Sequence, residues 1–209
     1  MKLTLFLSIV AVVSYALGGL NGAIITSVNL HRRDVRKYGS RNAGLTNFAR
    51  VFGTQGAILV VLVDMVKTII AVLFGRWLIG TQGYPDVGAL FAGFCTMLGH
   101  VYPAYYNLKG GKSVLCGGVI VWIVDWRIGL LCWSVFLIVV VFSKYVSLGS
   151  ICSAVTMPAA AWAFGHPNLD IILSLLCALL LIFAHRENII RLIKGTESKF
   201  NIGGAGGPA

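Results

Sequence analysis

The feature of this sequence that most limits its possible folds is a series of long segments with almost no charge. The first runs from Leu3 to Leu30 without a charged residue, and a helix of roughly 20 apolar residues is long enough to cross a bilayer. Of the 209 residues, 57% are hydrophobic and 11% are charged, whereas soluble domains carry about 25% charged residues. A soluble fold of this size could not bury so much apolar surface. The sequence therefore predicts an all-α, polytopic integral membrane helical bundle.

About seven transmembrane helices are expected in this bundle. The apolar segments lie near residues 3–26, 56–79, 87–105, 112–125, 128–146, 151–165 and 169–185. The fourth and sixth are short, so they could be tilted, broken or partly re-entrant, and six or eight spans remain alternatives. We expect residues 1–200 to form a single transmembrane domain and the Gly-rich residues 201–209 to form a flexible tail.

The amino-terminal segment also has features of a secretory signal, because Lys2 precedes an apolar run. The uncharged stretch continues to Leu30, however, and the basic block 31–37 follows it directly. This arrangement suits an uncleaved span better than a removed leader.

The distribution of basic residues predicts the orientation of the bundle. If the amino terminus is outside, only Lys2, Arg76 and Arg127 lie on the outer side, and Lys67 lies within a span. The remaining basic residues lie on the inner side: Arg32, Arg33, Arg36, Lys37, Arg41, Arg50, Lys109, Lys112, Lys144, Arg186, Arg191, Lys194 and Lys199. Cytoplasmic loops of membrane proteins carry such an excess of Lys and Arg. This asymmetry predicts a cytoplasmic carboxyl terminus, so the net charge of +10 is interpreted as a sign of membrane orientation rather than of nucleic-acid binding.

The first polar cluster, residues 39–50, has the composition of a phosphate-binding loop. Its small residues expose backbone N–H groups, and Arg50 adds a positive charge. The short hydrogen-bonding side chains are those of Ser40, Asn42, Thr46 and Asn47. The G-K-[ST] ending of a Walker loop is missing. A polar connecting loop is the alternative interpretation.

The second cluster is Lys109-Gly110-Gly111-Lys112-Ser113, directly before an apolar segment. Glycines let the backbone approach an anion closely, and lysines neutralise it. A following helix would also point its amino-terminal dipole at the same anion. The alternative is a basic turn that only anchors the topology.

Two further clusters lie near the same predicted face of the membrane. Ser147-Leu148-Gly149-Ser150 is a short predicted turn with two hydroxyls, which a helix cap would explain equally well. His185 and Asn188 are three residues apart and therefore share a helical face. Histidine and asparagine can orient a phosphate or a hydroxyl, although a solvated end of the last helix is an alternative.

Asp64 and Lys67 form a predicted ion pair within a span. A lone charge at mid-membrane costs on the order of 3 kcal/mol or more, and a partner one turn away reduces that cost. The pair is either a structural ion pair or a support for an active site. The five cysteines lie in apolar stretches without a C-x-x-C motif, so we expect packing residues, no disulfide and no metal site.

Together these clusters resemble the motifs of the PlsY family of membrane acyltransferases, in the same order along the chain. Residues 39–50 resemble G-S-G-N-x-G-A-T-N-x-x-R, and Asp64-x-x-Lys67 resembles D-x-x-K-G. Gly99-His100-Val101-Tyr102-Pro103, with Lys109 to Lys112, resembles G-H-x-F-P…K-G-G-K-G. Residues 147–150 resemble S-L-x-S, and residues 185–189 resemble H-R-x-N-I.

The resemblance implies transfer of a fatty acyl group from acyl phosphate to the 1-hydroxyl of glycerol 3-phosphate, giving lysophosphatidate and phosphate. It implies an enzyme of phospholipid biosynthesis in the bacterial cell membrane, with its active site facing the cytoplasm. Membrane lipid surrounds it, and we expect no cofactor and no obligate protein partner.

The resemblance also assigns roles to particular residues. Arg50 and Lys112 are expected to hold phosphate charge, while His185 and Asn188 place the glycerol phosphate. The expected catalytic residues are Ser40, Arg50, Lys112, His185 and Asn188. The expected substrate-binding residues are Asn42, Thr46, Asn47, Lys109, Gly110, Gly111, Ser147 and Ser150.

Four positions depart from the family pattern. Arg41 and Ser113 stand where the family usually has glycine. Leu45 replaces a small alanine, and Thr68 replaces the glycine after Lys67. These changes could be tolerated, could shift substrate affinity or could mark a weakened enzyme.

The sequence lacks the H-x-x-x-x-D motif of other glycerol-phosphate acyltransferases. No histidine has an aspartate five residues later, and His166 and Asp170 are four apart. Direct attack on acyl phosphate, with substrate phosphate accepting the hydroxyl proton, is therefore the expected chemistry. A small anion or lipid transporter and a non-catalytic family member are alternative interpretations, although no internal repeat of the transporter type is visible.

Overall fold

The computed structural model describes residues 2–200, and no strand occurs in that range. Met1 and the expected flexible tail at 201–209 lie outside the described residues. The helices are α1 (Lys2–Gly19), α2 (Gly22–His31), α3 (Leu45–Phe52), α4 (Ala57–Gly80), α5 (Pro85–Val101), α6 (Val114–Val124), α7 (Trp126–Ser143), α8 (Val146–Ala163), α9 (Asn168–Ala184) and α10 (Arg186–Ile193). Two 3₁₀ turns, η1 (Val35–Lys37) and η2 (Ala104–Tyr106), lie between them.

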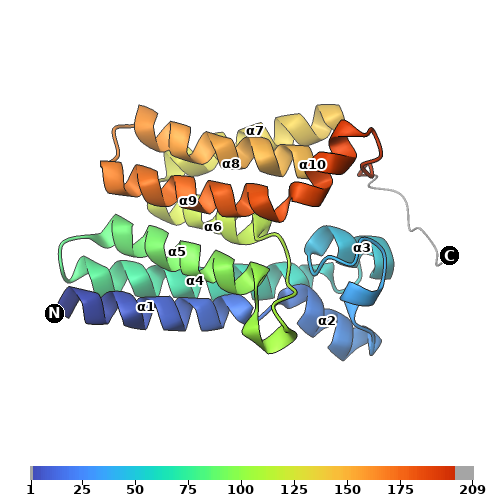
Figure 1. Ribbon diagram of the computed structural model, residues 1–209, viewed down its shortest axis with the longest axis horizontal. Coiled ribbons are helices and arrows are strands. Elements are labelled where there is room, and N and C mark those ends of the chain that lie inside the picture. The colour runs from blue at the N-terminus through green and yellow to red at the C-terminus, as the bar shows by residue number, and fades with distance from the viewer. Residues whose placement is uncertain (1, 201–209) are drawn as a thin grey trace.

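The long helices run side by side in two groups (Figure 1). One group contains α1, α4 and α5, and the other contains α7, α8 and α9, while α6 packs against α4, α5 and α7. A shared core of buried side chains, including Leu90, Met97 and Ile120, connects the groups. Large apolar side chains cover the outer surface, and Phe142 is 83% exposed. The predicted all-helical bundle is confirmed, and its apolar exterior suits a lipid environment.

Helix length and composition identify fewer complete spans than the sequence predicted. Five segments are long and apolar enough: residues 2–31, α4, α5 with the turn after it, α7 and α8. A sixth would combine α9 and α10, which are bent by 59° at their junction. The 11 residues of α6 extend only about 16 Å, roughly half of a hydrocarbon core. Each of the seven predicted segments nevertheless contains a helix.

Two predicted boundaries were wrong. The first predicted span, 3–26, is interrupted at residues 20–21, where α1 ends and α2 begins. The predicted turn at 147–150 is instead the first part of α8, because Lys144 and Tyr145 alone connect α7 to α8. Lys144 adopts a left-handed conformation with φ of 64°, which reverses the chain in this short space. Ser147 and Ser150 therefore project from a rigid helix.

Buried polar side chains satisfy the backbone at the interruption between α1 and α2. Lys67 Nζ donates hydrogen bonds to the carbonyl oxygens of Gly18, at 3.0 Å, and Leu20, at 2.8 Å. Asp64 Oδ1 lies 2.7 Å from the same ammonium and accepts a hydrogen bond from the Gly22 N–H at 3.1 Å. Unsatisfied backbone groups are costly away from water. Of the two interpretations of the Asp64–Lys67 pair, these contacts support the structural one.

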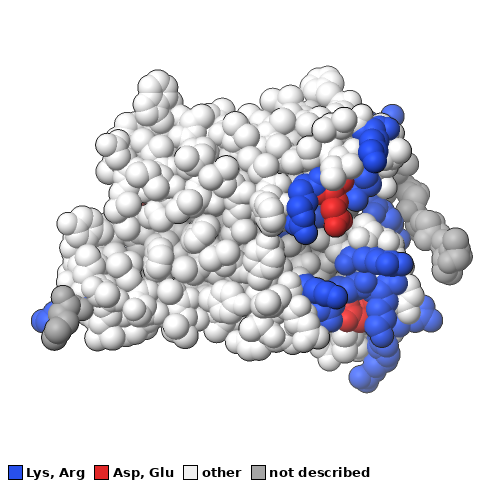
Figure 2. All heavy atoms as spheres, viewed as in Figure 1, with Lys and Arg blue, Asp and Glu red and all other residues white. Residues whose placement is uncertain are grey.

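Charged side chains gather at one end of the bundle (Figure 2). This end carries α2, α3 and α10, whereas the flank seen in the same view is free of charged side chains. The polar clusters of the sequence therefore meet at one end, as expected for motifs on one face of a membrane.

Two of the family departures lie where the backbone favours glycine. Arg41 has φ of 59° and Ser113 has φ of 62°, both in the left-handed region. A side chain in this region costs about 1–2 kcal/mol. The glycines usual at these positions would avoid that cost.

Replacing Arg41 with glycine should therefore stabilise the protein. Arg41 is exposed, and among residues 2–200 its side chain makes no hydrogen bond or ion pair; its backbone N–H donates to the Tyr38 carbonyl oxygen. Glycine also raises the entropy of the unfolded chain, which offsets about 0.5–1 kcal/mol of the gain. We expect Arg41→Gly to raise the midpoint of thermal unfolding in detergent by about 2–4 °C. Arg41→Ala keeps the Cβ atom and should leave the midpoint unchanged, so equal midpoints for the two variants would contradict this strain.

Candidate functional site

A cavity of about 1030 Å³ opens at the charged end of the bundle. Most of the predicted site residues line it: Ser40, Asn42, Thr46, Asn47, Arg50, Lys112, Ser147, Ser150, His185 and Asn188. These residues come from α3 and the loop before it, the start of α6, the start of α8, and the region from α9 to α10. Segments far apart in the sequence thus contribute polar groups to one space.

Asn47 organises the first loop from within. Its side-chain N–H group donates to the carbonyl oxygens of Tyr38, at 3.1 Å, and Asn42, at 3.0 Å, while its Oδ1 accepts from the Ser40 N–H at 2.9 Å. Through these bonds Asn47 determines the path of the loop backbone. The amino terminus of α3 opens on the cavity, because Gly44 and Thr46 both line it. Helix amino termini attract anions.

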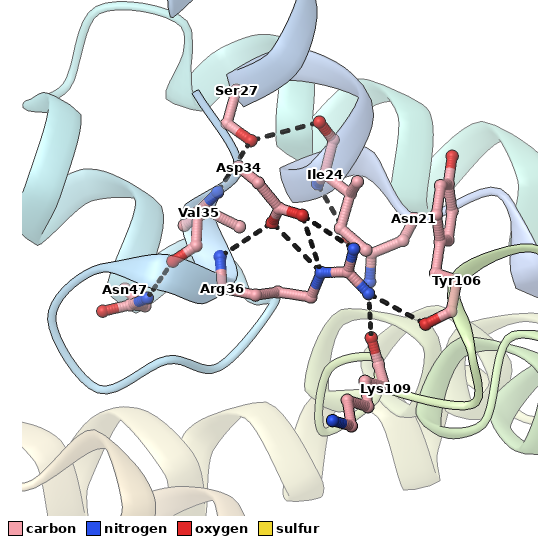
Figure 3. Close-up of polar contacts among 9 residues, drawn as sticks. All are labelled: Asn21, Ile24, Ser27, Asp34, Val35, Arg36, Asn47, Tyr106 and Lys109. Carbon is pink, nitrogen blue, oxygen red and sulfur yellow. Dashed lines mark hydrogen bonds and ion pairs between the residues drawn. The ribbon is translucent and has the colours of Figure 1, made fainter. Parts of the chain in front are cut away.

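Arg36 lies in η1, directly before this first loop, and binds the segment between α5 and α6 (Figure 3). Its NH1 atom donates to the carbonyl oxygens of Tyr106, at 2.8 Å, and Lys109, at 3.2 Å. Asp34 holds the guanidinium from the other side, with 2.7 Å between Arg36 NH2 and Asp34 Oδ2. The hydrogen bond from Arg36 lowers the pKa of Asp34, so the pair stays ionised at neutral pH. The two predicted anion-binding segments are thereby fixed to each other.

Lys109, Gly110 and Gly111 are not among the residues that line the cavity. The N–H groups of Gly110 and Gly111 donate to the carbonyl oxygens of Val101 and His100, at 3.1 and 3.0 Å. A Cβ atom on Gly110 would lie 2.0 Å from the His100 carbonyl oxygen. The glycines therefore allow close packing against the end of α5, and Lys112 is the cation of this segment that reaches the cavity.

A chain of hydrogen bonds crosses the polar end of the cavity from Lys112 to Glu197. Lys112 Nζ donates to Asn188 Oδ1, and Asn188 Nδ2 donates to Glu197 Oε1 at 2.6 Å. Ser147 Oγ donates to the same carboxylate oxygen at 2.8 Å, and Arg191 Nε donates to Oε2 at 2.7 Å. The sequence interpretation placed neither Arg191 nor Glu197 in the site. The three-residue spacing from Asn188 to Arg191 indicated a shared helical face, but nothing in the pattern showed that the chain returns at Glu197.

The charges at this end of the cavity influence one another. Burial and the positive charges of Arg191 and Arg50 lower the pKa of Lys112 to about 8, although Glu197 opposes this effect. Burial alone would raise the pKa of Glu197, but its hydrogen bonds from Asn188, Ser147 and Arg191 lower it overall. Glu197 is therefore an ionised group among several cations, and the net charge of the polar end favours anionic ligands.

His185 is buried at the junction of α9 and α10, with its Nδ1 2.9 Å from the Leu181 carbonyl oxygen. A carbonyl oxygen only accepts hydrogen bonds, so Nδ1 carries the proton. The other nitrogen, Nε2, is then an acceptor when the ring is neutral. His185 can thus receive a hydrogen bond from a ligand hydroxyl in the cavity.

The remainder of the cavity is apolar. Its lining includes Val121, Trp133, Phe136, Met157 and Cys177, from four helices of the bundle. An anionic group at the polar end and a hydrocarbon chain in the interior would both find suitable surroundings. Among residues 2–200, no group of three or more His, Cys, Asp or Glu is arranged to hold a metal ion.

Similarity to known proteins extends over almost the whole chain. A family model described as glycerol-3-phosphate acyltransferase matches residues 8–195. A protein of that name from Thermoanaerobacter pseudethanolicus is 40% identical over 189 residues, covering 90% of this chain and 93% of the relative. Another from Finegoldia magna is 34% identical over 197 residues, covering 93% and 96% of the two chains.

Solved structures show the same architecture. The crystal structure of PlsY, an integral membrane glycerol 3-phosphate acyltransferase, in its glycerol 3-phosphate form has a TM-score of 0.83 to this chain at 30% identity. That match covers 93% of this chain and 96% of PlsY. The lysophosphatidic acid form of PlsY gives a TM-score of 0.81 at 28% identity, with 93% and 95% coverage. This chain therefore belongs to the glycerol-3-phosphate acyltransferase family that includes PlsY.

Proposed function

We propose that this protein transfers a fatty acyl group from acyl phosphate to the 1-hydroxyl of glycerol 3-phosphate, producing lysophosphatidate and inorganic phosphate. The observation that carries the proposal is a single cavity with a cationic polar end and an apolar interior. Arg50, Lys112 and Arg191 supply positive charge for the phosphate groups of the two substrates. The apolar interior accommodates the acyl chain. The names of the relatives and of the PlsY structures support glycerol 3-phosphate as the acceptor.

The chemistry we infer needs no covalent enzyme intermediate. Oxygen O1 of glycerol 3-phosphate attacks the carbonyl carbon of acyl phosphate, and the bond from that carbon to the phosphate oxygen breaks. The departing phosphate takes the proton of the attacking hydroxyl. Acyl phosphate is already activated, so the protein mainly positions the two substrates and stabilises developing negative charge. Ser40, Ser147 and Ser150 line the polar end as hydroxyl donors for this purpose.

We infer that the protein acts in a bacterial cell membrane with the cavity mouth on the cytoplasmic side. The gathering of basic residues at the end that contains α2, α3 and α10 supports this orientation. Seven spans, with the amino terminus outside, would place both the cavity mouth and the carboxyl-terminal segment in the cytoplasm. In that arrangement α6 is the shortest span, and it packs against α4, α5 and α7.

An assay with purified protein in detergent or vesicles tests the proposed reaction. Phosphate release and lysophosphatidate formation should both require acyl phosphate and glycerol 3-phosphate together. Arg50→Ala should lower kcat/KM by about 100-fold or more, because a charge-assisted contact to phosphate is lost. Uptake of phosphate compounds into vesicles without acyl transfer would favour a transporter, and binding without either outcome would favour a non-catalytic protein.

The role of His185 separates substrate-assisted chemistry from general-base catalysis by the protein. If the departing phosphate takes the proton, His185→Gln should mainly raise the KM for glycerol 3-phosphate, with kcat falling less than about tenfold. A general base typically contributes about 100-fold or more to the rate. Loss of kcat on that scale, with both substrates still bound, would show that His185 takes the proton instead.

The shifted pKa of Lys112 predicts the alkaline limit of activity. A pKa lowered to about 8 means that the ammonium is fully charged below this pH and is lost as pH rises through it. We expect kcat/KM to fall above about pH 8, because a neutral amine no longer attracts phosphate. A profile of kcat/KM against pH measures this decline, which is the alkaline limb of the profile. Lys112→Arg should remove the limb, whatever its effect on the maximum rate, because guanidinium stays charged.

Glu197 provides a matched test of the same limb. Its negative charge raises the pKa of Lys112, so Glu197→Gln should move the alkaline limb to lower pH. Glu187 lies on α10 with an exposed side chain, 4.0 Å from Arg191, and makes no hydrogen bond to Asn188 or Ser147. Glu187→Gln should move the limb less. Identical profiles for the two variants would contradict the proposed coupling.

A further inference from the structure

One side chain, that of Trp133, is common to the main cavity and to a pocket on the outer surface of the bundle. Trp133 lines the main cavity, and it also lines a second pocket of about 400 Å³ on the outside of α6 and α7. The other residues of this outer pocket are Trp122, Leu130, Ser134 and Leu137. Trp122, Leu130 and Leu137 are each about half exposed, at 44%, 53% and 52%. In a bilayer this outer pocket faces lipid.

Specific contacts hold the Trp133 indole across the gap between α6 and α7. Its Nε1 donates a hydrogen bond to the Gly118 carbonyl oxygen at 3.1 Å. A Cβ atom on Gly118 would lie 3.2 Å from the indole, closer than ordinary contact, so glycine lets the ring lie against α6. Phe136, which also lines the cavity, supports the ring edge-on at a centroid distance of 6.2 Å. The wall at this point is one aromatic ring thick.

Another part of the cavity lining belongs to the main hydrophobic core. This part contains Val121, Cys132, Met157 and Cys177, and all four are buried in that core. Enlarging the cavity in that direction would require several helices to repack. The indole of Trp133, which is 37% exposed, is backed only by the outer pocket. A ligand chain too long for the closed interior would therefore press against this wall.

We propose that Trp133 is the residue that sets the upper limit of acyl-chain length, by separating the acyl cavity from the lipid-facing pocket. This inference rests on the proposed acyl-transfer function. Chains that fit inside the closed cavity bury all their methylene groups there. Longer chains have no space while the indole spans the gap, and removing it joins the two pockets into one channel open to the bilayer.

The test compares acyl phosphates of increasing chain length on wild type and Trp133→Ala at saturating glycerol 3-phosphate. For wild type, kcat/KM should rise with each methylene by up to about fourfold, the gain from burying one CH₂ group, and then fall beyond a limiting length. For Trp133→Ala the fall should disappear, so the ratio of long-chain to limiting-chain kcat/KM should exceed the wild-type ratio, with a gain of up to about fourfold per added methylene. An unchanged chain-length profile would overturn the proposal.

Two other variants make the result specific. Trp122→Ala enlarges only the outer pocket and should keep the wild-type profile, because Trp122 does not line the main cavity. Trp133→Phe keeps a ring but loses the hydrogen bond to Gly118, so its limit should be intermediate; it replaces Trp133→Ala if that variant does not fold. A shift caused by Trp122→Ala as large as that of Trp133→Ala would overturn the assignment.

Failure of the function can be told apart from failure of the inference. If wild type transfers no acyl chain of any length, the proposed reaction is wrong. Binding of alkyl phosphates of the same lengths then decides the role of Trp133. Affinity that falls beyond one length in wild type but not in Trp133→Ala supports the separating wall, and parallel affinities contradict it.

Discussion

The polar site depends on the stabilisation of an interrupted helix inside an apolar bundle. Between α1 and α2 the chain leaves the helical conformation, and the carbonyl oxygens of Gly18 and Leu20 need donors that lipid does not offer. Lys67 supplies them, and Asp64 neutralises Lys67 while capping the start of α2. The interruption redirects the chain so that the loop after α2 can fold over the cavity.

From this interruption the first loop is fixed at successive points. Asn21 lies in the break between α1 and α2, and its Nδ2 donates to the Ala43 carbonyl oxygen at 3.0 Å. The Ala43 N–H in turn donates to the Gly110 carbonyl oxygen at 3.4 Å. Arg36 then binds the same second segment at Tyr106 and Lys109. If these segments bind phosphate as proposed, positioning their groups before the substrates arrive reduces the reorganisation that binding requires. The cavity thus depends on a backbone framework as well as on the residues that line it.

The sequence was sufficient to predict the fold class and the convergence of its polar clusters. Apolar length predicted the long helices, although α2, α3 and α10 were not predicted as separate helices. The motifs predicted many of the polar residues that line the cavity, but not most of its apolar lining. The start of α8 was predicted near residue 151 but lies at Val146, because hydropathy does not show where a helix begins when serine and lysine lie at the boundary. Glu197 was missed because its contacts depend on the chain turning back after α10. The glycines of the second segment were recognised, but their close packing against α5 depends on tertiary structure.

Asn188 occupies a position where the chemical difference between an amide and an acid is decisive. Its oxygen faces the ammonium of Lys112, and its nitrogen donates to the carboxylate of Glu197 at 2.6 Å. Spontaneous deamidation of this residue would replace the donating nitrogen with an oxygen of nearly the same size. Two carboxyl groups would then face each other at that separation, and one would have to take up a proton or move away. Replacement of one nitrogen by an oxygen during ageing of the protein would therefore disrupt the polar end of the cavity.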